Sequence, residues 1–366
     1  MEPIKAKAYG KILIFGAYSI LEPGNVGLVV NIDKGTTTEV AETKSGRAVF
    51  NFKNFKILVA GERDGHKLDF KKSPEKIKFI KTAVEHTYKY LKYKEIRIKD
   101  IKLATMNDAE MNIKDMKTGF GSSATSTVST VAAVLKLHGI DDRELVYKIA
   151  RYSHYKAQDN VGSGFDISSS CFGSHFFQSE TGELDNDFIK YIEKNKHIKR
   201  QDFFWPIELK PIFIFTGKSA STKDLVKNVM KFKSKNPEEY NDFIEKYNKI
   251  NLECKTAFEE QNLEKIKHWL EKSWEHRKEL GKMANAKIEP GKITDLMFDL
   301  KIQGAFTAGL MGAGGGDTIL ALCKGEDSKK YFTEYLVKKG ILFFDGLKIA
   351  NKGYEFLKFK PSIHNL

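Results

Sequence analysis

Apolar and polar positions along the chain predict strands near the N-terminus, followed by a helix and a further strand. Short apolar runs at residues 12–15 and 27–30, and the Thr-rich stretch 36–40, predict strands separated by turns. From Ile77 onward apolar residues recur at every third or fourth position, which predicts a helix. Residues 95–101 are predicted to form the next strand.

The middle and C-terminal parts continue to mix the two patterns. A polar segment at residues 105–117 leads into a loop of glycine and serine, and the helical spacing that follows predicts a helix ending at Gly139. Asp141 or Asp142 is suited to cap the next predicted helix. The later predicted elements are a buried strand at 211–216, Lys-rich helices over 222–284, a strand over 303–310, a glycine turn, a strand over 318–323, a helix over 331–338 and a last strand near Ile341.

Strands and helices that alternate in both halves predict an α+β or α/β protein of two domains. A length of 366 residues also favours two domains over one. The stretch 181–203 is charged and rich in turn residues, and we place the junction there. The predicted domains are residues 1–190 and 205–366.

Composition limits the classes of protein that fit. A hydrophobic fraction of 41% with 12% aromatic residues excludes a disordered chain. The 3 cysteines are far apart, which argues against a disulfide framework or a cysteine zinc site and predicts a cytoplasmic protein. No signal-peptide core and no long apolar run is visible, so no membrane partner is expected.

The net charge of +13 leaves several interpretations open. It is compatible with a solvated Lys-rich surface, with a field that attracts anionic substrates, or with a nucleic-acid surface. No basic and aromatic nucleic-acid motif accompanies the charge, so nucleic acid is not expected as a partner. We expect a monomer or a homodimer.

The segment 117–125, Lys-Thr-Gly-Phe-Gly-Ser-Ser-Ala-Thr, opens a predicted helix. Backbone N–H groups in the first turn of a helix have no partner within it, and the helix dipole is positive there. Gly119 and Gly121 allow a ligand to approach the backbone closely, and the serine hydroxyls can bind phosphate or a metal ion. Plain helix capping by serine remains an alternative. A dinucleotide-binding fingerprint matches by its letters, but the segment before it is too polar for the buried strand it requires.

Residues 162–166 and 312–317 form further glycine-rich loops. In the first, Asp166 follows a flexible turn, where an aspartate is often only a cap. In the second, successive glycines between apolar strands leave backbone N–H groups exposed, so an anion nest or a wide hairpin turn is predicted. Each loop alone is a weak signal, whereas their joint occurrence is a strong one.

Taken in order, the segments 10–24, 117–125 and 311–317 resemble the signature motifs of the GHMP kinases, and the resemblance spans nearly the whole chain. It implies a two-domain α+β fold, with an N-terminal domain like ribosomal protein S5 domain 2 and a ferredoxin-like C-terminal domain. It also implies ATP and Mg²⁺ as cofactors.

Within that family, residues 21–24, 117–123, 162–166 and 217–222 are similar to the members that act on 5-phosphomevalonate, and His154 with residues 157–158 fits them too. This implies ATP-dependent formation of 5-diphosphomevalonate in isoprenoid synthesis. Ala17 and Tyr18 replace the Glu-His of mevalonate kinases, and residues 155–159 lack the glutamate that binds magnesium there. The alternatives are mevalonate kinase, another mevalonate-phosphate kinase and, from the S5-like fold and the charge, an RNA-binding protein.

The resemblance assigns roles to single residues. The catalytic residues are Lys11, Lys117 and Asp166, and Ser123 is the expected Mg²⁺ ligand. Because a phosphate acceptor is largely dianionic near neutrality, Asp166 is expected to hold Lys11 rather than to act as a base. The ATP-binding residues are Lys117, Gly119, Phe120, Gly121, Ser122, Ser123, Ala124 and Thr125. The acceptor-binding residues are Tyr18, Ser163, Gly164, Lys218, Ser219, Ser221, Thr222, Gly314 and Gly315, although 219–222 also suit a helix cap.

Overall fold

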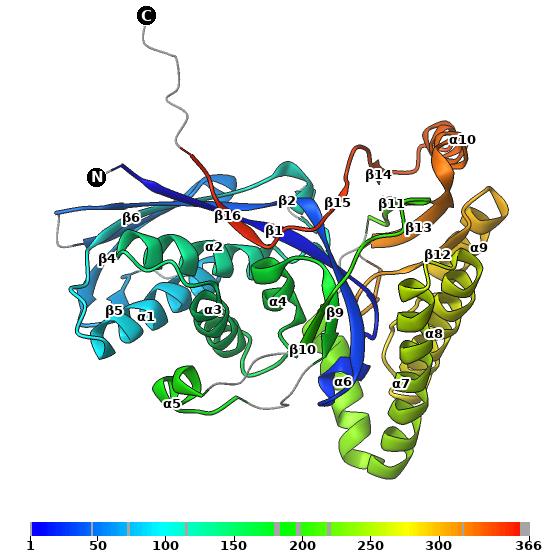
Figure 1. Ribbon diagram of the computed structural model, residues 1–366, viewed down its shortest axis with the longest axis horizontal. Coiled ribbons are helices and arrows are strands. Elements are labelled where there is room, and N and C mark those ends of the chain that lie inside the picture. Colours follow the sequence, from blue (N-terminus) through cyan, green and yellow to red (C-terminus); the bar gives the residue numbers. More distant parts are fainter. Residues whose placement is uncertain are drawn as a thin grey trace, which may run out of the picture.

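The computed structural model describes residues 2–44, 47–71, 74–113, 116–178, 184–194, 199–217, 221–316 and 318–358. A large sheet with its helices occupies one end of the molecule, and a smaller sheet with long helices occupies the other (Figure 1). This arrangement confirms the predicted α+β fold.

The large sheet has ten strands and is built around one long central strand. That strand, β2, pairs with β1, β6 and β9. It contains both 27–30 and 36–40, which were predicted as separate strands. All pairings in the sheet are antiparallel except that of β3 with β6. The ten strands are β1 (Ile4–Phe15), β2 (Val26–Glu42), β3 (Arg47–Phe52), β4 (Ile57–Asp64), β5 (Lys67–Asp69), β6 (Ile101–Asn107), β9 (His175–Gln178), β10 (Lys199–Asp202), β15 (Ile349–Ala350) and β16 (Tyr354–Phe356).

The strand predicted over residues 95–101 is wrong in position. The structure has no strand at 95–100, and β6 begins at Ile101. Residues 105–107 of the supposed polar connection therefore belong to the sheet, and the hairpin of β7 (Asn112–Ile113) and β8 (Met116–Lys117) lies outside it. Alternation in β6 places Ile101, Leu103 and Thr105 inward, and this burial fixes the register.

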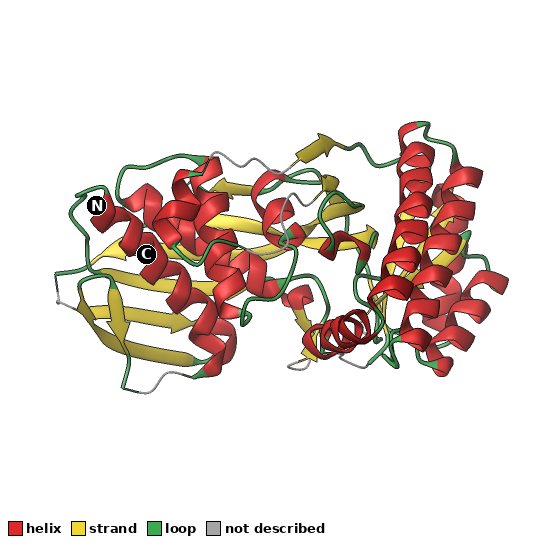
Figure 2. Cartoon of the chain, turned by 90° about the horizontal axis from the view of Figure 1, so that it is seen from below, coloured by secondary structure: helices red, strands yellow, loops and turns green. Residues whose placement is uncertain are grey.

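Helices cover one face of the large sheet (Figure 2). Their apolar sides pack with the inward residues of β2, β3 and β6 in a single core. The central helix α2 is buried on nearly every side, and Gly139 follows its C-terminal end with φ 83°. Asp142 caps α3 by accepting a hydrogen bond from the Leu145 N–H. The helices of this part are α1 (Lys78–Tyr93), α2 (Ser122–Leu137), α3 (Arg143–Ala157), α4 (Phe165–Phe172) and α5 (Phe188–Glu193).

The small sheet has four antiparallel strands in the order β12-β13-β11-β14. In β11, Ile212 and Ile214 pack beneath α9 and α10, whereas Phe213 and Phe215 face the cluster shared with β1 and Phe120. This shared cluster joins the two ends of the molecule. The strands are β11 (Leu209–Phe215), β12 (Thr307–Leu310), β13 (Thr318–Lys324) and β14 (Phe343–Phe344).

The remaining helices lie at the end of the molecule that contains the small sheet (Figure 1). They are α6 (Thr222–Lys235), α7 (Pro237–Glu259), α8 (Leu263–Met283), α9 (Gly291–Ile302) and α10 (Gly325–Lys338), and short 3₁₀ turns lie at Ser19–Leu21, Lys53–Phe55, Glu75–Ile77 and Ala109–Met111. The last strands, β15 and β16, return to the large sheet and pair with β2 and β1. The predicted division at residues 190–205 stays a prediction.

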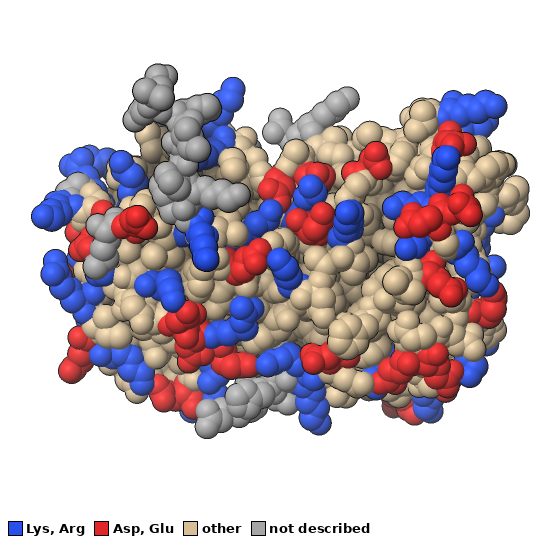
Figure 3. Space-filling model, turned by 45° about the horizontal axis from the view of Figure 1, so that its top comes forward, with Lys and Arg blue, Asp and Glu red and all other residues tan. Residues whose placement is uncertain are grey.

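Charged side chains of both signs are mixed over the face of the molecule in Figure 3. No large area of a single sign appears there, which favours the solvated-surface interpretation of the net charge on that face. Among the described residues, none of the helices combines the length and the apolar character that crossing a bilayer requires.

Candidate active site

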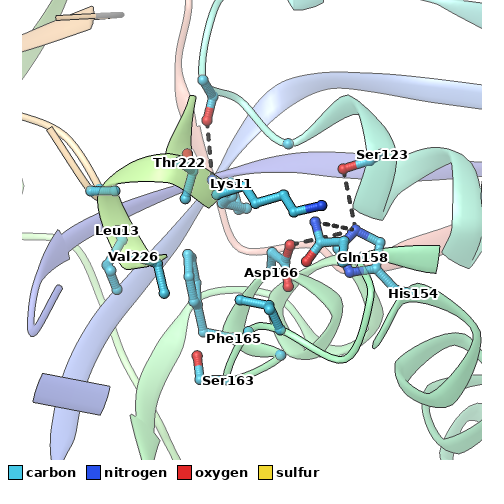
Figure 4. Close-up of a pocket in the computed structure, with 18 of the residues that line it drawn as sticks. Lys11, Leu13, Ser123, His154, Gln158, Ser163, Phe165, Asp166, Thr222 and Val226 are labelled. Atoms are coloured by element: carbon cyan, nitrogen blue, oxygen red, sulfur yellow. Dashed lines mark hydrogen bonds and ion pairs between the residues drawn. The ribbon is translucent and has the colours of Figure 1, made fainter. Parts of the chain in front are cut away.

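A cavity of about 430 Å³ lies where the two ends of the molecule meet (Figure 4). Its walls come from β1 and the turn after it, the N-termini of α1 and α2, the end of α3 and the loop before α4, the first turns of α6, and the loop between β12 and β13. The three motifs noted in the sequence therefore meet at one cavity.

The N-terminus of α2 forms one side of this cavity. Gly119 and Gly121 have φ values of 82° and 84°, a left-handed conformation that suits glycine, as predicted. The helix starts at Ser122, so its first N–H groups point toward the ligand space. The Lys11 amine donates a hydrogen bond to the Gly119 carbonyl at 3.1 Å, and its stem passes Gly121 so closely that a Cβ there would lie 3.0 Å from Cε.

A buried histidine connects the phosphate loop with the aspartate of the second loop. His154 is 2% exposed, and its Nε2 lies 3.2 Å from the Ser123 hydroxyl and 3.8 Å from Asp166 Oδ2. Gln158 Nε2 lies 3.4 Å from the same nitrogen. The amine of Lys11 points into this group (Figure 4). His154 sits on the buried side of α3, and the sequence singled it out only through the family resemblance, without assigning it a role.

Asp166 is in the first turn of α4, where Oδ1 accepts a hydrogen bond from the Ile167 N–H at 2.9 Å. The Lys11 amine lies over the neighbouring Phe165 ring, 5.2 Å from its centre. The expected grip of Asp166 on Lys11 stays a prediction. Gly164 has φ 85°, and a Cβ there would overlap the Arg151 guanidinium, so glycine is required next to this arginine.

Arg151 was missed by the sequence reasoning. It is 3% exposed, lines the cavity and donates to the Gly162 carbonyl at 2.8 Å. Arg277 of α8 has the same relation to the third loop, since it is 2% exposed and donates to the Gly312 carbonyl at 2.9 Å. Each arginine thus holds the backbone of one glycine loop by a hydrogen bond from its guanidinium. No motif carried a signal for either one.

The glycine loop between β12 and β13 corrects one expectation. Its N–H groups were expected to be exposed, but Gly312 donates to Leu13, Gly314 to Met311 and Gly315 to Ile288. These N–H groups therefore do not form an anion nest. Gly314 lines the cavity, and a role for Gly314 or Gly315 in acceptor binding stays a prediction.

Tyr18 has a positive φ of 65° and is 4% exposed. Its hydroxyl donates to the Ala313 carbonyl at 2.7 Å, and burial raises its pKa well above the ordinary value for tyrosine. The phenol is therefore a fixed donor that holds the third loop. Tyr18 also lines the cavity, so its predicted contact with the acceptor remains open.

Most of the other predicted residues either line the cavity or lie outside the described residues. Those that line the cavity are Phe120, Ser122, Ser163, Ser221 and Thr222. Ser221 also caps α6 by accepting from the Asp224 N–H at 3.2 Å. Lys218, Ser219 and the side chain of Lys117 lie outside the described residues, as does Asp317.

The end of the phosphate motif has its side chains in the core, and its assignment to ATP binding stays a prediction. Ala124 and Thr125 are fully buried and are absent from the described cavity lining. The Thr125 hydroxyl lies 2.6 Å from that of Thr36 in β2, and its N–H donates to the Gly121 carbonyl within the helix. Helix geometry turns these side chains toward the sheet, because only the first residues of α2 can face a ligand at its end.

The described residues contain no cluster of three or more histidine, cysteine, aspartate or glutamate side chains suited to a metal. Mg²⁺ needs no such cluster in a kinase, because one or two protein oxygens and the substrate phosphates complete its shell. The Asp166 carboxylate and the Ser123 hydroxyl both face the Lys11 amine and supply oxygens of the kind that Mg²⁺ prefers. The chemistry of this pair fits the ion.

Comparison with known proteins agrees with this geometry. The family model described as "GHMP kinases N terminal domain" matches residues 78–174, and "GHMP kinases C terminal" matches residues 254–341. A phosphomevalonate kinase of Saccharolobus solfataricus is 31% identical over 347 residues, which cover 93% of this chain and 96% of that protein.

Solved structures share the fold at lower identity. A Listeria innocua protein superposes with a TM-score of 0.85 at 21% identity, covering 98% of this chain and 100% of that one. Streptococcus pneumoniae phosphomevalonate kinase, in complex with phosphomevalonate and AMPPNP, gives 0.76 at 20% identity, covering 96% and 100%. With the family models matched in both halves and a relative above 30% identity over nearly the full length, the chain belongs to the GHMP kinase family.

Proposed function

We propose that the chain transfers the γ-phosphoryl group of ATP to the phosphate of 5-phosphomevalonate, giving ADP and 5-diphosphomevalonate in isoprenoid synthesis. The cavity carries the proposal, because it joins an anion-binding helix terminus to Lys11 and Asp166. The identity of 31% to a phosphomevalonate kinase supports this acceptor. We further propose that the enzyme works in the cytoplasm.

The donor phosphates are proposed to lie at the N-terminus of α2. Free N–H groups and the helix dipole stabilise phosphate there, and Gly121 keeps the backbone open. Lys11 supplies a positive charge that its contact with the Gly119 carbonyl holds in place. Phosphoryl transfer demands positioning and charge neutralisation more than covalent help from the protein, and these residues provide both.

The acceptor phosphate needs no general base. The second pKa of a phosphate monoester is about 6, so the nucleophilic oxygen is already ionised near neutrality. Asp166 then serves to orient its surroundings, including His154 at 3.8 Å and, as we propose, Lys11. His154 in turn lies within hydrogen-bond distance of the Ser123 hydroxyl, which fixes that oxygen toward the phosphates.

Mg²⁺ is proposed to be held by Asp166 and Ser123, and when bound it supplies positive charge to the phosphate oxygens. The remaining work belongs to the chain itself. Ser163, Thr222 and Tyr18 line the side of the cavity that we assign to the acceptor. Arg151 holds the loop that contains Ser163 in position by its hydrogen bond to the Gly162 carbonyl.

The test is an activity screen with purified protein, ATP and Mg²⁺. We expect ADP release with 5-phosphomevalonate, and phosphorus NMR should show the coupled resonances of a diphosphate. Mevalonate and mevalonate 3-phosphate serve as comparison acceptors. Faster turnover of either would replace the proposed acceptor, and the absence of ADP release with all three would refute the function.

A further inference from the structure

Two lysines of the cavity lining, from different helices, hold the same carboxylate. The Lys78 amine lies 3.1 Å from Asp159 Oδ1, and the Lys223 amine lies 2.5 Å from Asp159 Oδ2. All three residues line the cavity. The sequence had assigned a role to none of them.

The three side chains come from separate parts of the fold. Lys78 is the first residue of α1, Asp159 follows α3, and Lys223 is in the first turn of α6. Asp159 and the following Asn160 have φ values of 59° and 65°, in the left-handed region that Asp and Asn tolerate better than other residues with a side chain. This turn places the carboxylate between the lysines.

These ion pairs are exposed to solvent and easily exchanged. The side chains of Lys78, Asp159 and Lys223 are 34%, 54% and 61% exposed. Exposed pairs add little net stability, because water solvates both partners well when they separate. Hydrogen bonds from Lys223 and Lys78 lower the pKa of Asp159, so it remains ionised. Lys78 has a second carboxylate nearby, since its amine lies 3.9 Å from Glu75 Oε1.

The two anionic groups of 5-phosphomevalonate, its phosphate and its carboxylate, lie at opposite ends of this substrate. Its phosphate must meet the donor near Lys11 and Ser123, which leaves its carboxylate directed away from the reaction. Thr222 precedes Lys223, and Phe79, which follows Lys78, packs its ring 5.1 Å from that of His154. Each lysine is therefore next in the chain to another residue that lines the cavity.

We propose that Lys78 and Lys223 form a subsite for the carboxylate of the acceptor, and that Asp159 occupies this subsite until the substrate displaces it. The inference rests on the proposed function, since it assumes an acceptor with a carboxylate opposite its phosphate. The protein already shows that this pair of amines binds a carboxylate, because its own Asp159 is bound there.

The first experiment compares Lys78→Met and Lys223→Met with Lys227→Met, an exposed lysine one turn further along α6 that is not among the described cavity-lining residues. Steady-state KM is measured for 5-phosphomevalonate and for ATP. We expect the acceptor KM to rise about tenfold in each subsite variant, as for the loss of one charge-assisted hydrogen bond. The KM for ATP, and both constants in Lys227→Met, should stay within a factor of two.

The second experiment uses the acceptor whose carboxylate is replaced by a neutral primary amide. Binding is measured by calorimetry in the presence of a non-hydrolysable ATP analogue. Lys223→Met should weaken binding of the acid about tenfold and leave binding of the amide unchanged. An equal loss for acid and amide, or a rise confined to the KM for ATP, would overturn the subsite.

Asp159→Asn tests the displacement itself. Removing the competing carboxylate should lower the acceptor KM about threefold, because the unoccupied subsite becomes the ground state. A higher KM would show that Asp159 assists binding rather than competing, and would overturn that part. If the wild-type protein phosphorylates 5-phosphomevalonate but both lysine variants match Lys227→Met, the subsite fails while the function stands. A wild-type protein inactive on this acceptor refutes the function instead.

Discussion

Replacing Gly121 by alanine should separate the role of the phosphate loop from the stability of its helix. Gly121 lies just before α2 with φ 84°, and a Cβ there would come within 3.0 Å of Lys11 Cε. A left-handed alanine costs about 1–2 kcal/mol of folding stability. The contact with the flexible lysine stem costs little more, but the stem must shift and its amine shifts with it.

The structure offers a matched control at the other end of the same helix. Gly139 has φ 83°, and a Cβ there would meet no atom within 4 Å. Gly139→Ala therefore carries the same backbone penalty without touching the cavity. Both variants should lose about 1–2 kcal/mol in urea unfolding, whereas only Gly121→Ala displaces Lys11.

Activity should distinguish the variants. Misplacing one charge that stabilises the transition state costs about a hundredfold or more in kcat, so we expect that loss in Gly121→Ala alone. The assay is ADP release at saturating ATP and acceptor, with unfolding curves measured on the same preparations. A Gly121→Ala enzyme of normal kcat would refute the proposed role of Lys11. An equal loss in Gly139→Ala would show that helix stability, not the loop, limits activity.

Three further predictions concern charge. Asp166→Asn should lower kcat strongly at every pH, and rescue of turnover as the pH rises through about 6 would show instead that Asp166 is a base. Arg277→Met should change the free energy of unfolding by less than about 1 kcal/mol, or raise it, and should lower kcat/KM. The variant loses the hydrogen bond to the Gly312 carbonyl, but it also removes a buried cation whose Nε and Nη2 lack partners in the described structure. A loss above about 3 kcal/mol in urea unfolding would contradict this prediction. Burial lowers the pKa of His86 to about 3. The free energy of unfolding should therefore fall by about 2 kcal/mol between pH 6.5 and 5, because the unfolded chain takes up the proton. His86→Phe keeps a ring beside Phe188 and should lose correspondingly less, and an unchanged slope of unfolding free energy against pH would refute the assignment.

A helix or a strand could be predicted from the sequence where burial leaves a clear pattern of apolar residues. Helix α2, the capped start of α3 and the buried strand β11 were predicted because helical spacing, a capping residue and a continuous apolar run are each recognisable in the sequence. The strand at 95–101 was misplaced, since a half-buried strand with polar outward residues resembles a connection. The short strands β15 and β16 carry no pattern, because their pairing with β2 and β1 depends on residues more than 300 positions away.

The site was predictable where backbone geometry requires glycine, and elsewhere it was not. Gly119 and Gly121 signal their left-handed conformation by residue type. Lys78 and Arg151 give no such signal, because their partners lie on other elements and ordinary charged residues look the same in either context. Glu22 shows the reverse case: it lies in a motif, yet it accepts hydrogen bonds from Lys233 and Tyr240 and so anchors the helices rather than the substrate.

The charges of the cavity explain why an exchangeable ion pair is useful in so basic a chain. In the described structure the lining has four cations and three anions, namely Lys11, Lys78, Arg151 and Lys223 with Glu75, Asp159 and Asp166. An excess of one positive charge is small beside the negative charge of two phosphorylated substrates. Unpaired lysines in the cavity lining would bind any anion. Paired with Asp159, as proposed for the subsite, they favour a ligand whose carboxylate can satisfy both amines at once, and this holds for the acceptor and for its product alike.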